Sequence, residues 1–227
     1  MKLEACTNAP YLCTVPELPL MIQRLQQRLQ QPLPGLSVQM EMTSRPDRAS
    51  QLLREDHRKS GVLALFYPHH EEALHLVFMQ RATYDGVHSG QVSFPGGRFE
   101  PGDPDITFTA LRESHEELGI LPEAVQVLGQ LSPLYIPPSN FLVYPTVGYI
   151  DRRPEFVPSV REVEKIIEVE TRHLLRAEAR QMSTLHLTPG LSMKVPAFIV
   201  DGSIIWGATA MMLNELLHLM REVDGHR

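Results

Sequence analysis

The residues of this chain that are best suited to chemistry lie between positions 94 and 120. Six acidic residues occupy this stretch against two arginines, so the local field is strongly negative and suited to neutralising a cation. At about 100° per residue, Glu116 and Glu117 fall within about 60° of Glu113 on one face of a helix. The acidic residues of the stretch are Glu100, Asp103, Asp105, Glu113, Glu116 and Glu117.

Three carboxylates on one helix face predict a site for a divalent cation. Like charges three or four positions apart destabilise a helix by roughly 0.2–0.5 kcal/mol per pair. Three glutamates on one face therefore suggest that a bound cation offsets their repulsion. Carboxylate oxygens suit Mg²⁺ or Mn²⁺, and such ions also bridge substrate phosphates. Gly96 and Gly97 just upstream favour a site over a solvated acidic face, because glycine lets the backbone approach a ligand closely.

The opposite face of the same helix carries Phe108, Leu111 and Leu118, which we expect to pack into the core. Asp103, followed by Pro104, has two interpretations that the sequence leaves open. It is either the N-cap of the helix, with proline at the first helical position, or a member of the acidic site.

Hydrophobic periodicity predicts the elements that position these residues. Helices are expected over residues 17–31, 47–56, 105–118 and 208–223. Strands are expected over residues 61–67, 73–80, 125–131, 141–150, 166–169 and 194–200, and the first two form a hairpin. The glycine-rich residues 81–103 are expected to form a structured loop. Strands interleaved with a few helices indicate one α/β domain.

Composition and charge argue against several classes of protein. With Lys+Arg 21 against Asp+Glu 27, the 227-residue chain has a net charge of −6, which is unlike a general nucleic-acid-binding protein. The two cysteines, Cys6 and Cys13, form neither a disulfide framework nor a zinc site, which favours a cytoplasmic protein. No apolar run is long enough to span a membrane, and the N-terminus does not have the pattern of a signal peptide.

Residues 97–120 resemble the Nudix box of the Nudix hydrolases, Gly-x5-Glu-x7-Arg-Glu-U-x-Glu-Glu-x-Gly-U, where U is a bulky apolar residue. The matching positions are Gly97, Arg112, Glu113, Glu116, Glu117, Gly119 and Ile120. Three positions depart from the pattern. Asp103 replaces the first glutamate, eight residues rather than seven separate it from Arg112, and Ser114 takes an apolar position.

Residues 81–97, RATYDGVHSGQVSFPGG, resemble the motif that precedes the box in coenzyme A pyrophosphatases, roughly Arg-Ser-x-x-Leu-Arg-x-His-x-Gly-x-Val-x-Phe-Pro-Gly-Gly. The matching positions are Arg81, His88, Gly90, Val92, Phe94, Pro95, Gly96 and Gly97. Ala82 replaces serine, and Asp85 with Gly86 replaces Leu-Arg, which removes a charge that could meet a substrate phosphate. The longer box, YIPPS at 135–139 and IWGATA at 205–210 extend the likeness over roughly residues 47–221.

The resemblance implies a Nudix-type α/β/α sandwich with a mixed sheet over residues 47–227. Residues 1–46 form an N-terminal extension with an amphipathic helix. The implied reaction is metal-dependent hydrolysis of the pyrophosphate bond of coenzyme A or acyl-CoA, giving adenosine 3′,5′-bisphosphate and 4′-phosphopantetheine or its acyl form. Two alternatives stay open: hydrolysis of another nucleoside diphosphate derivative, such as ADP-ribose or NADH, and a non-catalytic Nudix-fold ligand-binding module. The expected partner is a small nucleoside diphosphate, with no nucleic acid and no membrane, and a homodimer is left open.

The resemblance also assigns roles to individual residues. Mg²⁺ or Mn²⁺ would be held by the carbonyl of Gly97 and by Glu113, Glu116 and Glu117. These three glutamates and Arg112 form the catalytic set, with Arg112 holding a box carboxylate through a bidentate pair. The substrate-binding candidates are Arg81, His88, Gly90 and Phe94.

Three further points stay open on the sequence. The general base is a box glutamate, Glu162 or Glu164. Trp206 either stacks on a base or is a buried residue before a helix. Met211 and Met212 are expected in the core of the last helix.

Overall fold

The computed structural model of the chain describes residues 19–45, 53–70, 73–82, 90–188 and 191–225. The substrate-binding candidate His88, the altered motif positions Asp85 and Gly86, and both cysteines lie outside the described residues. Within the described part of the chain, no helix is both long and apolar enough to cross a membrane.

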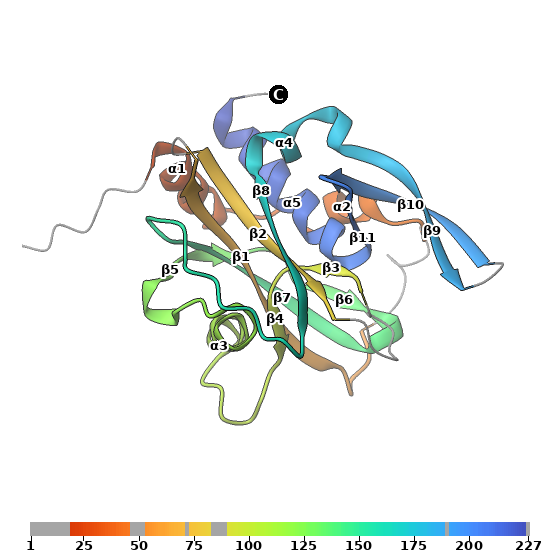
Figure 1. The fold of residues 1–227 in the computed structure, drawn as a ribbon, viewed down its shortest axis with the longest axis horizontal. Helices are drawn as coiled ribbons and strands as arrows, with labels where there is room; N and C mark the ends of the chain where they lie inside the picture. Colours follow the sequence, from red (N-terminus) through yellow and green to blue (C-terminus); the bar gives the residue numbers. More distant parts are fainter. Residues whose placement is uncertain (1–18, 46–52, 71–72, 83–89, 189–190, 226–227) are drawn as a thin grey trace, which may run out of the picture.

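A mixed sheet forms the centre of the molecule (Figure 1). Its path runs β3–β2–β1–β7–β5. In this path, β1 (Arg58–His69) is parallel to β7 (Phe141–Tyr149) and antiparallel to β2 (Ala73–Arg81). Off the path, β4 pairs with β1, β6 with β7 and β8 with β2. The remaining strands of this sheet are β3 (Val92–Ser93), β4 (Gly96–Arg98), β5 (Gln126–Gln130), β6 (Leu134–Ile136) and β8 (Val163–Glu170).

The central strand β1 is buried on both faces. Successive side chains of a strand point to opposite sides, and those of β1 enter two separate hydrophobic cores in turn. A continuous apolar run such as GVLALFY is typical of a strand that is covered on both sides. The alternating members are Val62, Ala64 and Phe66 in one core and Leu63, Leu65 and Tyr67 in the other.

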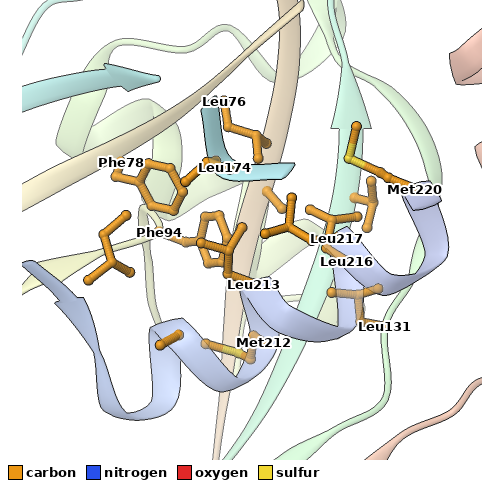
Figure 2. Packing of buried hydrophobic residues seen from close by; sticks show 14 of the residues in the cluster. Leu76, Phe78, Phe94, Leu131, Leu174, Met212, Leu213, Leu216, Leu217 and Met220 are labelled. Carbon is orange, nitrogen blue, oxygen red and sulfur yellow. The ribbon is translucent and has the colours of Figure 1, made fainter. Parts of the chain in front are cut away.

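Helices cover both faces of the sheet, which confirms the predicted α/β/α sandwich (Figure 1). On one face lie α1 (Leu20–Leu29), α2 (Leu36–Gln39) and α5 (Gly207–Asp224), while α3 (Ile106–Leu118) lies on the other. Figure 2 shows α5 packing its apolar side chains against Phe78 and Phe94, whose rings stack with centroids 4.8 Å apart. Met211 and Met212 are buried in α5, as predicted.

A smaller antiparallel sheet lies beside α5. It has the order β11–β10–β9 and is formed by β9 (Arg180–Thr188), β10 (Leu191–Val200) and β11 (Ser203–Trp206). The short helix α4 (Thr171–Leu175) connects β8 to this sheet. Because β11 contacts β3, the small sheet reaches the edge of the main sheet just before Gly96.

Most predicted elements are confirmed within a few residues, including α1, α3, α5 and the β1–β2 hairpin. The helix predicted over 47–56 is wrong for residues 53–56, and its other residues lie outside the described part. A turn forms there instead, because the His57 N–H donates to the Arg54 carbonyl (3.2 Å) and Arg54 pairs with Asp56 (2.8 Å). The loop predicted over 81–103 contains the short strands β3 and β4.

The prediction for the buried face of α3 is confirmed for Leu118, which is fully buried, and in part for Leu111, which packs against the same core, but it is wrong for Phe108. Phe108 is 42% exposed, whereas the buried residues are Thr109, Ala110, Ser114, Glu117 and Leu118. The buried face is rotated from the predicted face by roughly 100° of helix. At the position where the box usually has an apolar residue, the Ser114 hydroxyl donates to the Ala110 carbonyl (2.6 Å), so its burial leaves the hydroxyl hydrogen-bonded.

A close approach at Gly61 explains this orientation. A Cβ on Gly61 would lie 2.5 Å from the Ile106 carbonyl oxygen and 2.9 Å from the Ala110 nitrogen. The helix therefore packs closely on β1 through small residues, and the spacing of large apolar residues identifies only part of its buried face.

The substitution Gly61→Ala tests this contact. The added methyl group meets helix backbone that cannot rotate away, so we expect the free energy of unfolding to fall by about 1–3 kcal/mol. Gly102→Ala is the matched control, because nothing lies within 4 Å of a Cβ at that position. Denaturant unfolding measures both, and equal stability of the two variants would contradict the close packing.

Candidate active site

The support of the site is an ion pair between Asp103 and Arg112. The guanidinium donates from Nε to Oδ1 (2.9 Å) and from Nη2 to Oδ2 (3.0 Å), which makes the pair bidentate. The Asp103 carboxylate also accepts from the Glu100 backbone N–H (3.0 Å) and the Thr109 hydroxyl (2.8 Å). The Arg112 hydrogen bond keeps the pKa of Asp103 well below its usual range, although burial acts in the opposite direction.

The interpretation of Asp103 as the N-cap of α3 is wrong. Asp105 is the N-cap, and its side chain accepts a hydrogen bond from the Phe108 N–H (2.8 Å). Asp103 instead lies buried beside α3, where it faces Arg112.

Arg112 joins the loop before α3 to the acidic residues of the helix. Beyond Asp103, its guanidinium donates to Glu113 (3.0 Å), Glu116 (3.3 Å) and the carbonyl of Arg98 (3.2 Å). The hydrogen bond to Asp103 raises the pKa of Arg112, so this cation stays charged. The structure thus contains the bidentate pair that the resemblance implies, with Asp103 as its acceptor.

Glu117 is the buried carboxylate of the site, with a side chain that is 3% exposed. It accepts the Gly96 backbone N–H (2.8 Å), and Arg81 Nη1 lies 3.3 Å from its other oxygen. Burial raises the pKa of Glu117 to about 7, and the charges of Glu113 and Glu162 add to the rise, whereas the Gly96 hydrogen bond and the Arg81 charge oppose it. A carboxyl group that titrates near neutrality is typical of functional sites.

Glu113 lies directly against Gly97. A Cβ on Gly97 would collide with the Glu113 carboxylate, so only glycine permits this approach. The Gly97 carbonyl accepts a hydrogen bond from the Ser60 hydroxyl (2.7 Å). Burial raises the pKa of Glu113, whereas the charge of Arg112 lowers it. The Gly96–Gly97 backbone and the carboxylates of Glu113 and Glu117 are therefore close neighbours.

The donor set at this place suits a hard cation, although its side chains are now paired with arginine. As placed, no three Asp, Glu, His or Cys side chains among the described residues are close enough to hold one metal ion. The Glu116 side chain is 54% exposed and turned toward Arg112. The Glu113 carboxylate occupies the place that a side chain at position 97 would take, so carboxylate oxygens, which suit such a cation, lie against the Gly97 backbone. A cation would bind by replacing arginine contacts.

A cavity of about 620 Å³ opens beside the Gly96–Gly97 backbone. Three arginines line it, namely Arg45, Arg81 and Arg98, and no Asp or Glu is among the described residues of its lining. Much of the remaining wall is apolar, and includes Phe94, Phe141, Met193 and Trp206. Cavities of this size hold small organic ligands, and this lining suits an anionic molecule with an apolar part.

The candidates for substrate binding are placed differently from one another. Arg81 lines the cavity, and Phe94 forms part of its wall while its ring is 1% exposed. Gly90 adopts a positive φ of 67° just before β3 and is not among the lining residues. Trp206 comes directly before α5, as one interpretation predicted, but it is partly exposed rather than buried, and it lines the cavity.

Of the two later glutamates considered as a general base, Glu162 is near the acidic helix. Its negative charge contributes to the raised pKa of both Glu113 and Glu117. The Glu164 carboxylate accepts a long hydrogen bond from the Gln80 side chain (3.5 Å).

Several residues that line the cavity could not be identified from any local sequence pattern. Ser60, Arg45 and Met193 reach the cavity from separate parts of the chain and belong to no motif. Gly61 could have been found, because a glycine within an apolar strand marks a close approach of another backbone.

Comparison with known proteins identifies the family. Residues 57–182 match the model of the NUDIX domain. The chain is 36% identical over 141 residues to the uncharacterized Nudix hydrolase NudL of Yersinia enterocolitica. The match covers 62% of this chain and 71% of that relative. It is 33% identical over 149 residues to NudL of Yersinia pestis, and the match covers 66% of this chain and 72% of that relative. The crystal structure of a MutT/nudix family protein from Enterococcus faecalis has the same fold, with a TM-score of 0.51 and 14% identity over 78% of this chain and 71% of that one.

The sandwich fold and the acidic helix, taken with these matches, define a hydrolase of nucleoside diphosphate derivatives. The chain belongs to the Nudix family. Nudix hydrolases generally use divalent metal ions and bind small nucleoside diphosphate substrates.

The raised pKa of Glu117 predicts a pH-dependent stability. Because this pKa is about 7 rather than the ordinary 4.5, the folded protein holds the proton more tightly than the unfolded chain. The resulting stabilisation is complete below about pH 4.5 and is lost as the pH rises through about 7. Glu117→Gln has no such proton to lose and keeps an acceptor for Gly96. We expect this variant to be more stable than the wild type above pH 7, by on the order of 3 kcal/mol.

Denaturant unfolding between about pH 4.5 and pH 8.5 in the presence of a chelator measures this difference. The gap between the two proteins should close as the pH falls toward 4.5. A gap that does not change with pH would mean that Glu117 keeps an ordinary pKa.

Proposed function

We propose that this chain hydrolyses the pyrophosphate bond of coenzyme A or an acyl-CoA. The products would be adenosine 3′,5′-bisphosphate and 4′-phosphopantetheine or its acyl form. The motif over residues 81–97 supports this choice, since it resembles the sequence before the box in coenzyme A pyrophosphatases.

One observation carries the proposal: the Gly96–Gly97 backbone borders the arginine-lined cavity and also contacts Glu113 and Glu117. A diphosphate bound beside this backbone would lie next to the acidic helix. The rest of the cavity would then receive the groups attached to the diphosphate. Arg45, Arg81 and Arg98 supply positive charge for phosphate oxygens, including those of a 3′-phosphate.

The chemistry requires charge neutralisation at phosphorus and positioning of the attacking water. The ligands of Mg²⁺ or Mn²⁺ would be Glu113, Glu116, Glu117 and the Gly97 carbonyl. When bound, the ion neutralises developing charge and activates water. Arg112 fixes the helix against the loop through Asp103, and so holds the glutamates in place. The base that receives the proton from water would be a box glutamate or Glu162.

The other candidates for substrate binding complete the proposal. His88 and Gly90 belong to the same motif, and Phe94 forms apolar wall. The domain assignment of residues 47–227 with an extension over 1–46, a cytoplasmic location, and the absence of nucleic-acid or membrane partners are further parts of the proposal.

A substrate panel tests the proposed substrate: coenzyme A, dephospho-coenzyme A, ADP-ribose and NADH, with Mg²⁺ and then Mn²⁺. We expect coenzyme A to give the highest kcat/KM, with adenosine 3′,5′-bisphosphate identified by chromatography. A preference for ADP-ribose or NADH would show that Asp85 and Gly86 redirect specificity, and would leave only the family activity. No metal-dependent cleavage of any compound would instead favour the ligand-binding module.

Glu117→Gln tests the role of the acidic helix. We expect turnover to fall about 100-fold or more, because a group that acts on developing charge is lost while the fold persists. Glu123→Gln changes an exposed glutamate after the box and serves as the matched control. Unchanged turnover in Glu117→Gln would remove the metal assignment.

A further inference from the structure

Part of the cavity wall comes from outside the matched domain. The NUDIX domain match covers residues 57–182, whereas Met42, Met193, Val195 and Trp206 all line the cavity. Met42 precedes the matched region, and the other three follow it. The Gly96–Gly97 end of the cavity, by contrast, belongs to the matched domain. The family domain therefore supplies the Gly96–Gly97 border of the cavity and part of its apolar wall, including Phe94 and Phe141, and the flanking segments supply the rest of that wall.

The flanking segments contact each other at the cavity. The Ser44 hydroxyl lies 4.0 Å from the sulfur of Met193, and both residues line the cavity. Met42 is 1% exposed, so it is fixed within the packed wall. Met212 of α5, also buried, lines the cavity as well.

A buried carboxylate on α5 holds the N-terminal segment in this position. Glu215 is fully buried and lies three residues after Met212 on the helix. Its two oxygens accept four hydrogen bonds, two from the N-terminal segment and two from Ser132 of the matched domain. The donors are Gly35 N (3.0 Å), Gln39 Nε2 (2.8 Å), Ser132 N (3.2 Å) and Ser132 Oγ (2.6 Å).

The residue before Glu215 strengthens the same connection. The side-chain amide of Asn214 donates to the Val38 carbonyl (2.8 Å) and to Glu41 (3.3 Å). Glu41 in turn pairs with Arg180 at the start of β9 (2.8 Å). One turn of α5 thus anchors residues 35–41, and the chain continues directly into Met42–Arg45 at the cavity.

We infer that Met42, with Met193, Val195 and Trp206, forms a specificity subsite for an apolar substituent of the substrate, and that Glu215 is the positioning residue that holds the segment of Met42 in place. This inference rests on the proposed function, because it assigns the group that occupies the wall beyond the diphosphate. The substituent is a hydrocarbon chain, as in the acyl group of an acyl-CoA.

The chemistry of the wall favours a hydrocarbon over a polar group. Met193 and Trp206 are partly exposed, whereas Met42 and Met212 are buried lining residues. The thioether chains are apolar and adapt their shape to a ligand. Each methylene that leaves water for such a wall contributes about fourfold in binding. Kinetic preference should therefore increase with acyl length until the wall is filled.

The test is a competition between acetyl-CoA and octanoyl-CoA in one reaction. The ratio of their kcat/KM values does not depend on how much enzyme is folded or on the rate of the common chemistry. We expect the wild type to prefer octanoyl-CoA by about tenfold or more, and Met42→Ala to lower this ratio about fivefold or more. Met40→Ala is the matched control, because Met40 packs on the core and does not line the cavity.

Glu215→Gln tests the positioning role separately. The amide replaces an acceptor oxygen with a donor, so the donors from Gly35, Gln39 and Ser132 cannot all remain satisfied. We expect faster hydrogen exchange at the Gly35 amide and a fall of the octanoyl-to-acetyl ratio toward that of Met42→Ala. A merely structural role would lower both rates together and leave the ratio unchanged.

The outcomes separate this inference from the proposed function. Cleavage of both acyl-CoAs at equal efficiency, or a preference that Met42→Ala leaves intact, would overturn the subsite while the proposed function stands. If neither compound is cleaved with Mg²⁺ or Mn²⁺, the proposed function fails. Calorimetric measurement of the affinity for acetyl-CoA and for octanoyl-CoA then tests the subsite by itself. Octanoyl-CoA must then bind more tightly than acetyl-CoA, with the difference lost in Met42→Ala.

Discussion

The close approach of α3 to β1 at Gly61 is the constraint on which the rest of the site depends. The backbone around Ile106 and Ala110 lies so near Gly61 that there is no room for a side chain. This contact fixes the rotation of α3, and the rotation turns Glu113 and Glu117 toward the Gly96–Gly97 backbone. Gly61 on β1 and Gly97 on β4 therefore have the same effect. A side chain at either position would push the acidic helix away from the sheet.

Burying Glu117 has an energetic cost, and the site offsets it only in part. The Gly96 N–H and Arg81 stabilise the carboxylate, yet its pKa still rises to about 7. Asp103 shows the opposite balance, because the bidentate bond to Arg112 outweighs its burial. The Asp103 carboxylate is thus held firmly in its charged form by Arg112. The Glu117 carboxylate lies in an environment where a bound cation would stabilise its charged form.

Local patterns in the sequence predicted the β1–β2 hairpin, α1, α3 and α5, because each carries its own apolar periodicity. The box residues were found by their spacing on one helix face, and they do lie beside the Gly96–Gly97 turn. The buried face of α3 was predicted correctly at Leu118 but wrongly at Phe108, because the close contact with β1 is made at Gly61 and Ala110, and such small residues give little hydrophobic signal. The apolar wall could not be predicted for a different reason. Met42, Met193 and Trp206 are far apart in sequence, and only the fold, with Glu215 bridging α2 and α5, brings such residues to one cavity.

The most direct test of the site is the binding of Mn²⁺ itself, followed by electron paramagnetic resonance of the free ion in the absence of substrate. If Glu113, Glu116, Glu117 and the Gly97 carbonyl form the cation site, the wild type binds Mn²⁺ and Glu117→Gln binds it about tenfold more weakly or worse. Glu123→Gln should bind like the wild type. Equal affinity in the wild type and in Glu117→Gln would contradict the assignment, because it would place the cation away from the buried face of α3.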